Sequence, residues 1–186
     1  GQAAEATAIL TLCKAGDHIV SASTLYGGTH TLLGVNLTKL GIETTFVNPD
    51  DPENFRKALR PNTKLLYAET LGNPLINIVD IAAVAAIAKD AGVPFLVDNT
   101  VPSPYLCRPI EHGADLVVHS ATKFIGGHSD LLAGIILTSR SFPPLLAPRS
   151  SGRCSPHRLP SVLPDDPLPI GEHPHRLRRR IDHRRD

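Results

Sequence analysis

Hydrophobic and polar positions follow two periods along the first 140 residues. Segments with apolar residues at helical spacing alternate with short, continuous apolar runs, which are typical of strands buried on both faces. The pattern predicts helices over 4–16, 31–41, 51–59 and 79–92. It predicts strands over 18–23, 42–48, 63–69, 93–99, 114–120 and 131–139. We therefore expect a mostly parallel sheet with helices on both faces.

Several element ends carry their own signals. Gly16, Gly41 and Gly92 follow three of the predicted helices and are typical of helix C-termini. Asp80 precedes the clearest helix and is expected to cap its N-terminus. The two glycines within residues 24–30 predict a loop between a strand and the next helix.

Composition changes sharply near Arg140. Residues 1–140 contain ten Lys and Arg against thirteen Asp and Glu. Residues 141–186 contain nine Arg and no Lys against five acidic residues, together with nine of the 17 prolines. This second part has no sustained helical or strand period, and its composition favours disorder. The sequence therefore predicts a domain over 1–140 and a Pro/Arg-rich tail over 141–186.

Three interpretations of the tail remain open. A basic stretch can bind nucleic acid, but this one has no interleaved aromatic residues, so no nucleic-acid partner is expected. Its histidines could bind metal adventitiously. A shifted reading frame in GC-rich coding DNA would also produce Arg, Pro, His and Ser enrichment, and we favour this interpretation. The chain contains no methionine, even at position 1, and is expected to be an internal fragment.

The apolar runs, the start of the chain and the cysteines indicate where in the cell the protein is found. No apolar run approaches the roughly 18 residues that span a bilayer, so no membrane association is expected. The start of the chain lacks the basic region of a signal peptide. Cys13, Cys107 and Cys154 are scattered, without a CxxC pair. These features predict a cytoplasmic protein without a disulfide framework or a metal site.

Two chemically distinctive residues come directly after predicted strands. Asp98 ends "FLVD", and Lys123 follows "LVVHSAT". The carboxyl ends of parallel strands meet at one edge of a sheet, where ligands bind. Asp98 is either a helix cap or ion-pair partner, or the partner of a cationic ring nitrogen such as that of pyridoxal phosphate. Lys123 is either a solvated residue at a strand exit or an amine that forms a Schiff base with that cofactor.

Other residues near these strand ends have two interpretations as well. The hydroxyl groups of Ser120 and Thr122 could bind a phosphate, as could the open backbone N–H groups of Gly1 and Gln2 at the start of the first helix.

An aromatic and an amide residue complete the set. Tyr26, beside two glycines, is either a core residue or a ring that lies flat on a planar cofactor. Asn73 in "ETLGNP" is either a turn residue or part of the site.

The motifs "GQAA", "YGGT", "ETLGNP", "VDNT", "CRPIEHGAD" and "HSATKFIGGHSD" together resemble one protein family. Residues 1–140 resemble the large domain of the Cys/Met-metabolism family of pyridoxal-phosphate enzymes. The resemblance implies an α/β fold with three layers and a mostly parallel sheet, the aspartate-aminotransferase-like (type I) fold, here incomplete.

The resemblance also implies roles for individual residues. Lys123 would be the catalytic Schiff-base lysine, and Asp98 would pair with the pyridine nitrogen. Tyr26 would stack on the ring and take part in catalysis, and Asn73 would lie near the ring hydroxyl and the substrate. The phosphate of pyridoxal 5'-phosphate would be held by Gly1, Gln2, Ser120 and Thr122.

The implied activity is replacement at Cγ of an O-acyl-homoserine, such as O-acetylhomoserine, by sulfide or a thiol to give homocysteine or methionine precursors. Most motifs resemble the O-acetylhomoserine sulfhydrylase branch, whereas "GHSDLLAGII" is more similar to cystathionine γ-synthase and γ-lyase. Activity of the γ-synthase, cystathionine γ-lyase or methionine γ-lyase type is therefore an alternative.

The resemblance also implies how the subunits of the protein assemble. It implies a homo-oligomer, a dimer of dimers, in which subunits share active sites. The arm and the substrate-binding arginine of the family are not found in these residues. The chain alone is therefore expected to be inactive, and a fragment that at most binds the cofactor is a second alternative.

Overall fold

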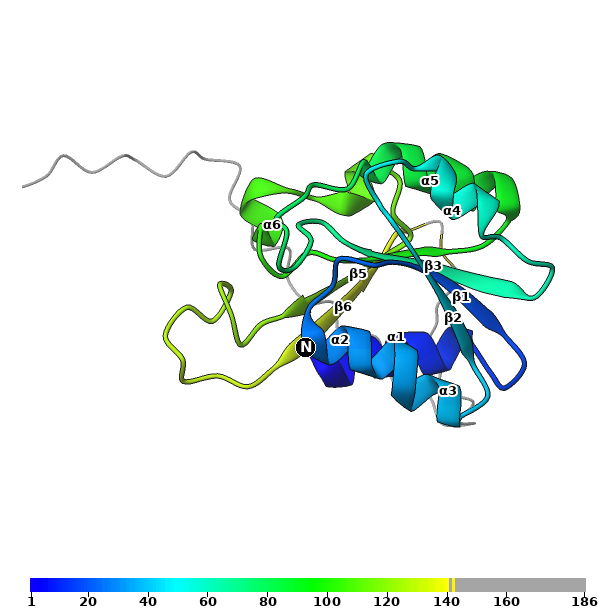
Figure 1. Ribbon diagram of the computed structural model, residues 1–186. Helices are drawn as coiled ribbons and strands as arrows, with labels where there is room; N and C mark the ends of the chain where they lie inside the picture. Colours follow the sequence, from blue (N-terminus) through cyan, green and yellow to red (C-terminus); the bar gives the residue numbers. More distant parts are fainter. Residues whose placement is uncertain (141, 143–186) are drawn as a thin grey trace, which may run out of the picture. The chain divides into compact units, whose positions relative to one another are not determined.

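A single six-stranded sheet runs through the protein, and the computed structural model describes residues 1–140 and 142 (Figure 1). The strand order is β2-β1-β3-β4-β5-β6. The first five strands in the chain pair in parallel, and β6 is antiparallel to β5. The strands are β1 (His18–Ala22), β2 (Glu43–Val47), β3 (Thr63–Glu69), β4 (Phe95–Asp98), β5 (Leu116–Ser120) and β6 (Gly134–Thr138).

Helices cover both faces of the sheet (Figure 1). One face carries α1 (Gln2–Leu12), α2 (Gly27–Thr31) and α3 (Leu37–Lys39), with a π-helical segment over Leu32–Asn36. The other face carries α4 (Glu53–Lys57), α5 (Ile81–Ala91), α6 (Ser103–Leu106) and a 3-10 turn over Pro109–His112. The predicted three-layer α/β architecture with a mostly parallel sheet is confirmed.

The central strands are buried on both faces because each lies between two helical layers. Leu65 and Leu66 on β3 are fully buried, as are Phe95 and Leu96 on β4. Neighbouring residues of a strand point to opposite faces, so a continuous apolar run fills both halves of the core. This explains why these strands show no polar alternation in the sequence.

The helix predicted over 79–92 has both of its expected ends. An Asp80 carboxylate oxygen accepts the Ala83 N–H at 2.9 Å, which caps the N-terminus of α5. Gly92 follows with φ of +67°, the left-handed conformation that glycine adopts without strain.

The helix predicted over 4–16 is shorter at its C-terminus than expected. α1 ends at Leu12, and Cys13 is already extended. Asp17 competes with the last turn, because its carboxylate accepts the Lys14 N–H at 2.8 Å while its own N–H donates to the Lys14 carbonyl at 3.0 Å. Gly16 is therefore part of this turn, with φ of +90°, and the prediction that it closes the helix was wrong.

The loop predicted over 24–30 is also wrong in part. The helical segment begins at Gly27, directly after Tyr26, and continues as far as Lys39. Gly28 serves a close contact, because a Cβ there would lie only 2.6 Å from the Tyr26 ring. Gly41, with φ of +77°, follows the end of this helical segment as predicted.

The predicted boundary near Arg140 and the tail over 141–186 lie outside the described residues, apart from Phe142. Within the described part of the chain, no helix is both long enough and apolar enough to cross a membrane.

A buried histidine joins the three strands at one side of the sheet. His18 on β1 is fully buried, and its two ring nitrogens lie 2.8 Å from the hydroxyls of Thr63 on β3 and Thr45 on β2. Burial lowers the pKa of His18, and the nearby positive charge of Arg60 lowers it further, against an opposing effect of Glu43. His18 therefore stays neutral in the folded protein at pH values where the unfolded chain takes up a proton.

Stability should depend on this imidazole. Because the folded pKa lies below the ordinary 6.5, the free energy of unfolding should fall as the pH falls through 6.5. In His18→Gln this part of the pH dependence should be lost, whereas exposed His112→Gln should keep it. Urea unfolding at pH 7.5 and 5.5 measures the difference. An equal loss of stability on acidification in the wild type and His18→Gln would contradict the prediction.

Candidate active site

A cavity of about 750 Å³ lies at the edge of the sheet where the strands β3, β4 and β5 end. This volume suits a ligand of cofactor size. The cavity brings together all the residues for which the sequence predicts a role in the site: Gly1, Gln2, Tyr26, Asn73, Asp98, Ser120, Thr122 and Lys123. Of the described residues that line it, Lys123 is the only lysine or arginine.

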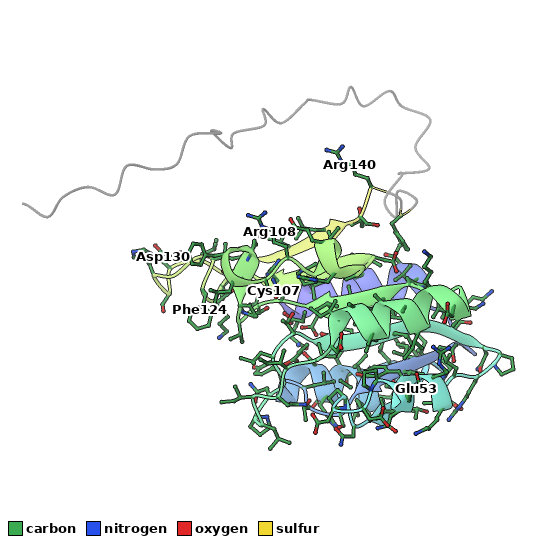
Figure 2. The ribbon with its side chains drawn as sticks, turned by 90° about the horizontal axis from the view of Figure 1, so that it is seen from above. Glu53, Cys107, Arg108, Phe124, Asp130 and Arg140 are labelled. Atoms are coloured by element: carbon green, nitrogen blue, oxygen red, sulfur yellow. The ribbon has the colours of Figure 1, made fainter. Side chains whose placement is uncertain are left out.

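Lys123 reaches the cavity from the turn that follows β5. Its N–H donates to the Ser120 carbonyl at 3.0 Å, and its carbonyl accepts the Gly127 N–H at 2.8 Å. Gly126 permits this turn, because a Cβ there would lie 2.7 Å from the Ala121 carbonyl oxygen. The segment continues beyond the sheet before it returns as β6, and Figure 2 shows Phe124 and Asp130 on this projecting part. Gly126 and Gly127 thus allow the tight turn that places Lys123 at the cavity.

Asp98, at the end of β4, is held by its own turn. Its Oδ1 accepts the Thr100 N–H at 2.8 Å and the Thr100 hydroxyl at 2.5 Å. The Thr100 hydroxyl oxygen in turn accepts the Ser120 N–H at 2.8 Å, which links the ends of β4 and β5. The capping interpretation therefore describes one carboxylate oxygen, and Asp98 also lines the cavity.

The start of α1 lies directly against the end of β5. A Cβ at Gly1 would lie 2.8 Å from the Ser120 Cβ, and a Cβ at Gly134 would lie 2.7 Å from the Ala4 Cβ. Only glycine, which has no Cβ, allows the start of α1 to lie this close to the end of β5 and to β6. The first helical turn has N–H groups without intrahelical acceptors, so a phosphate near Ser120 would find open donors there. The Thr122 hydroxyl lies beside them but already exchanges hydrogen bonds with the Ala133 backbone at 3.3 and 3.1 Å.

Tyr26 stands at the mouth of the cavity with 54% of its surface exposed, which argues against the core interpretation. Its ring packs over Gly28, and its backbone N–H donates to Glu69 Oε1 at 2.7 Å. Glu69 is the last residue of β3 and the register partner of Asp98 on β4. The carboxylate that fixes Tyr26 therefore comes from the strand beside Asp98.

Two buried acids near Asp98 were missed by the sequence interpretation. Burial raises the pKa of Glu69 to about 8, against the Tyr26 hydrogen bond, and the negative charges of Asp98 and Glu5 add to the rise. Burial, and then the charge of Asp98, raise the pKa of Glu5 to about 7. Glu69 could have been found as the polar end of an otherwise apolar strand run. Glu5 had a weaker signal, an acidic residue within an Ala-rich helix.

Asn73 lies in a tight loop after β3, in which the Gly72 N–H donates to the Asn77 carbonyl and the Ile76 N–H to the Gly72 carbonyl, both at 2.8 Å. The turn interpretation therefore describes this backbone well, and the Asn73 side chain also lines the cavity.

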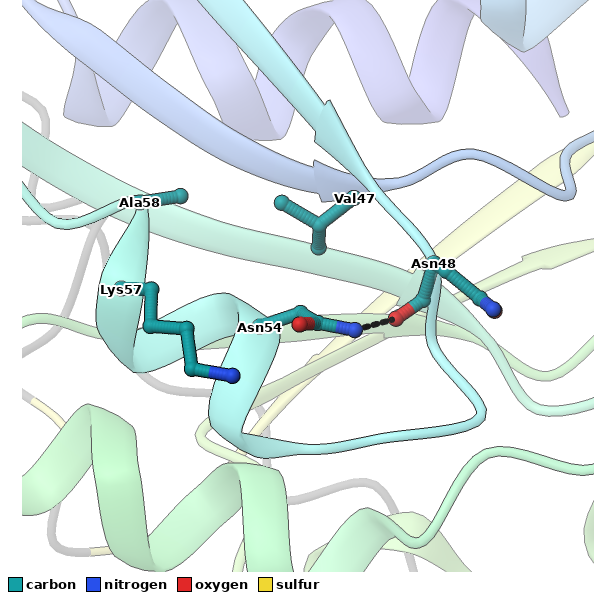
Figure 3. A pocket seen from close by; sticks show the side chains of 5 residues that line it. All are labelled: Val47, Asn48, Asn54, Lys57 and Ala58. Atoms are coloured by element: carbon teal, nitrogen blue, oxygen red, sulfur yellow. Dashed lines mark hydrogen bonds between the residues drawn. The ribbon is translucent and has the colours of Figure 1, made fainter.

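A second hollow, of about 400 Å³, lies after β2 (Figure 3). The Asn54 side-chain N–H donates to the Asn48 carbonyl at 3.1 Å, as Figure 3 shows. The Lys57 ammonium lies 3.7 Å from an Asp51 carboxylate oxygen. These groups satisfy one another, so this hollow offers no comparable set of reactive groups.

The first cavity thus combines an amine, a carboxylate, an aromatic ring and a helix N-terminus beside a hydroxyl. This donor set fits a planar cationic ring that carries an aldehyde and a phosphate, which is the chemistry of pyridoxal phosphate, and the sheet is that of the type I fold of pyridoxal-phosphate enzymes. The chain belongs to the family of Cys/Met metabolism PLP-dependent enzymes, whose family model matches residues 1–145.

Individual relatives agree with this assignment. The chain is 56% identical over 142 residues to an O-acetyl-L-homoserine sulfhydrylase from Leptospira meyeri, covering 76% of this chain and 32% of the relative. It is 49% identical over 133 residues to a cystathionine gamma-lyase from Bacillus subtilis, covering 72% of this chain and 35% of the relative. The chain therefore spans about a third of the length of these relatives.

A solved structure from Campylobacter jejuni, described as an O-acetylhomoserine (thiol)-lyase, superposes with a TM-score of 0.74. It is 36% identical in sequence and covers 75% of this chain and 34% of its own. That structure contains a pyridoxyl-lysine phosphate. The cofactor of this family is thus pyridoxal phosphate, as the sequence predicted.

Thr100 should control cofactor affinity through Asp98. Thr100→Val removes the hydroxyl bond to the carboxylate and the acceptor of the Ser120 N–H. A hydrogen bond to a charged group contributes about 1.5–3 kcal/mol, so pyridoxal-phosphate affinity should fall roughly 10- to 100-fold. Thr100→Ser should restore most of it, and exposed Thr11→Val should have no effect. Absorbance titration with the cofactor measures this, and unchanged affinity in Thr100→Val would contradict it.

Proposed function

We propose that this chain is the cofactor-binding part of an enzyme that replaces the acyloxy group on Cγ of an O-acyl-homoserine by sulfide or a thiol. The observation that carries the proposal is that all eight residues with predicted roles line one cavity, with Lys123 and Asp98 on adjoining strand ends. The greater identity to the sulfhydrylase than to the γ-lyase supports replacement over elimination.

The residues have distinct tasks in this proposal. Asp98 pairs with the ring nitrogen, Tyr26 covers the ring, and the first turn of α1 with Ser120 binds the phosphate. Gln2 and Thr122 border the phosphate position, and Asn73 faces the ring hydroxyl and the substrate. When bound, the cofactor supplies an electron sink for negative charge that develops on the substrate.

Proton movement falls to Lys123. Its amine removes a proton from the substrate Cα and then one from Cβ, so that the group on Cγ can leave, and it returns protons to Cβ and Cα after sulfide has added, the work of a general base and then a general acid. The Cγ–O bond breaks and the acyloxy group leaves as a carboxylate, and sulfide forms the new bond to Cγ, so O-acetylhomoserine and hydrogen sulfide give homocysteine and acetate. A cytoplasmic homo-oligomer, a dimer of dimers with sites shared between subunits, completes the proposal.

A γ-lyase is the second candidate function, supported by the 49% identity to the Bacillus subtilis enzyme. Two chimaeras separate the candidates, with residues 1–140 placed in the matching segments of the Leptospira meyeri sulfhydrylase and of this γ-lyase. Homocysteine formation from O-acetylhomoserine and sulfide is assayed against 2-oxo acid release from cystathionine.

We expect the sulfhydrylase chimaera to retain activity close to that of its parent, and the γ-lyase chimaera to lose at least about tenfold. The opposite result would assign this chain to the lyases. Loss of activity in both chimaeras, with the cofactor bound, would overturn the proposed function.

Lys123 should be the point of covalent attachment. In Lys123→Ala, the visible absorbance of the bound cofactor and the borohydride-stable adduct should disappear. Turnover of the sulfhydrylase chimaera should fall by at least about 10²–10⁴, the usual contribution of a general acid–base group. Peptide mass spectrometry after reduction locates the adduct, with exposed Lys89→Ala as the control. An adduct that persists in Lys123→Ala would refute the assignment.

Asp98 should matter more for rate than for binding. Asp98→Ala should still bind the cofactor, with affinity lower by roughly 10- to 100-fold through loss of a charge-assisted hydrogen bond worth about 1.5–3 kcal/mol. Turnover should fall by several powers of ten, because the ring nitrogen loses the charge that keeps it protonated. Exposed Asp90→Asn is the control. Turnover near that of the unsubstituted chimaera would show that Asp98 is structural.

A further inference from the structure

The backbone N–H of Tyr26 receives its acceptor from a distant part of the chain. Tyr26 is the N-cap of α2, and the N–H groups at the start of a helix have no acceptor within the helix. Glu69 supplies that acceptor from the end of β3, because its Oε1 lies 2.7 Å from the Tyr26 nitrogen. The two residues are 43 positions apart in the sequence, so this bond holds one segment of the fold against another.

Glu69 has a well-defined place in the sheet. It is only 9% exposed, and it is the last residue of β3 and the register partner of Asp98 on β4. The N–H of the next residue, Thr70, donates to the Asp98 carbonyl at 2.9 Å, so the two strands stay paired to their ends. Register partners on neighbouring strands point to the same face of a sheet. Glu69 and Asp98 therefore project side by side, and both line the cavity.

The segment that carries Tyr26 makes two further close contacts. The Tyr26 ring packs over Gly28, where a Cβ would lie 2.6 Å from it. Thr24 lies against the loop that follows β3, because a Cβ on Gly72 would lie 2.5 Å from the Thr24 hydroxyl oxygen. About half of the Tyr26 surface is exposed, so the core does not hold the ring. The direction of the ring therefore depends on the backbone that Glu69 binds.

We propose that Glu69 is a positioning residue, which fixes the Tyr26 ring relative to Asp98 by accepting the Tyr26 N–H. The inference rests on the proposed function, in which Tyr26 covers the cofactor ring and Asp98 pairs with its nitrogen. One strand end, that of β3, then sets the position of one of these groups and is paired with the strand that carries the other. Oε1 accepts an N–H in either protonation state of the carboxyl, so a neutral amide oxygen can replace it.

Loss of the acceptor should displace the ring. Without Glu69 Oε1, the Tyr26 N–H would be left unpaired at a partly buried position, which is costly, and the backbone would turn towards another acceptor. Glu69→Leu removes the acceptor at similar side-chain size, whereas Glu69→Gln keeps an acceptor oxygen. Exposed Glu53→Leu is the matched control.

The first experiment measures the pyridoxal-phosphate Kd of these variants of the 186-residue chain by absorbance titration. The Kd should rise about tenfold in Glu69→Leu and at most about threefold in Glu69→Gln, as the loss or weakening of one hydrogen bond predicts. Glu53→Leu should bind like the wild type. An unchanged Kd in Glu69→Leu would overturn the inference.

A double-mutant cycle with Tyr26→Ala separates positioning from a direct contact with the cofactor or a purely structural role. Tyr26→Ala keeps the backbone N–H that Glu69 binds but removes the ring. In this background, Glu69→Leu should change the Kd by less than about twofold, the usual limit for independent sites. The same tenfold rise in both backgrounds would show that Glu69 acts without the Tyr26 ring, and would overturn the inference.

A third measurement does not depend on the cofactor. In the ¹⁵N-labelled, cofactor-free chain, hydrogen exchange of the Tyr26 amide should be equally slow in the wild type and Glu69→Gln. It should be at least about tenfold faster in Glu69→Asp, whose carboxyl is one methylene shorter, through loss of this one bond. Equal exchange in all three would overturn the inference. Glu69→Asp also takes the place of Glu69→Leu in the titrations if the latter fails to fold.

The two proposals fail in different ways. A wild-type chain that protects the Tyr26 amide but binds no pyridoxal phosphate would refute the proposed function, and this inference with it. A wild-type chain that binds the cofactor with a Kd that Glu69→Leu and Glu69→Asp leave unchanged would refute the role of Glu69 alone.

Discussion

The parallel register of β3, β4 and β5 is the constraint on which the site depends. Glu69 pairs with Asp98, and Asp98 pairs with Val118, so the next residues of each strand emerge together at one edge. A shift by one residue would turn Asp98 to the opposite face, towards the layer of α5. The hydrophobic core prevents such a shift, because the apolar residues that precede Asp98 on β4 are fully buried. Packing in the sheet therefore sets the positions of the reactive groups.

Much of this arrangement follows from the sequence because the signals are local and repeated. The strands β4 and β5 contain the continuous apolar runs Phe95–Val97 and Leu116–Val118, and α5 has both a capping aspartate and a terminal glycine. Parallel strands place their carboxyl ends together, so residues such as Asp98 and Lys123 could be assigned to one edge without knowledge of the fold.

The parts that could not be predicted depend on individual side-chain contacts, which neither hydrophobic period nor residue type reveals. The end of α1 is decided by Asp17, whose carboxylate competes for the backbone of the last turn. Gly28 is a glycine because the Tyr26 ring needs its space, which no local turn rule reveals. Glu5 is polar on a mostly apolar helix, and its burial follows only from the packing of α1 on β3, β5 and β6. The errors at the end of α1 and at Gly28 thus arise from contacts between residues only two or three positions apart.

The two glycines at the interface of α1 with the end of the sheet, Gly1 and Gly134, have an evolutionary consequence. A Cβ on Gly1 would lie only 2.8 Å from the Ser120 Cβ, and one on Gly134 only 2.7 Å from the Ala4 Cβ, so neither position has space for a methyl group. An alanine at either position would push the helix outward and carry the open amides of its first turn away from Ser120. Substitutions within α1 can be accommodated by repacking of neighbouring side chains, whereas Gly1 and Gly134 have no space for a side chain. The separation between helix and strand end is thus encoded by the absence of side chains, and selection on cofactor binding would act there even though neither residue has a functional group.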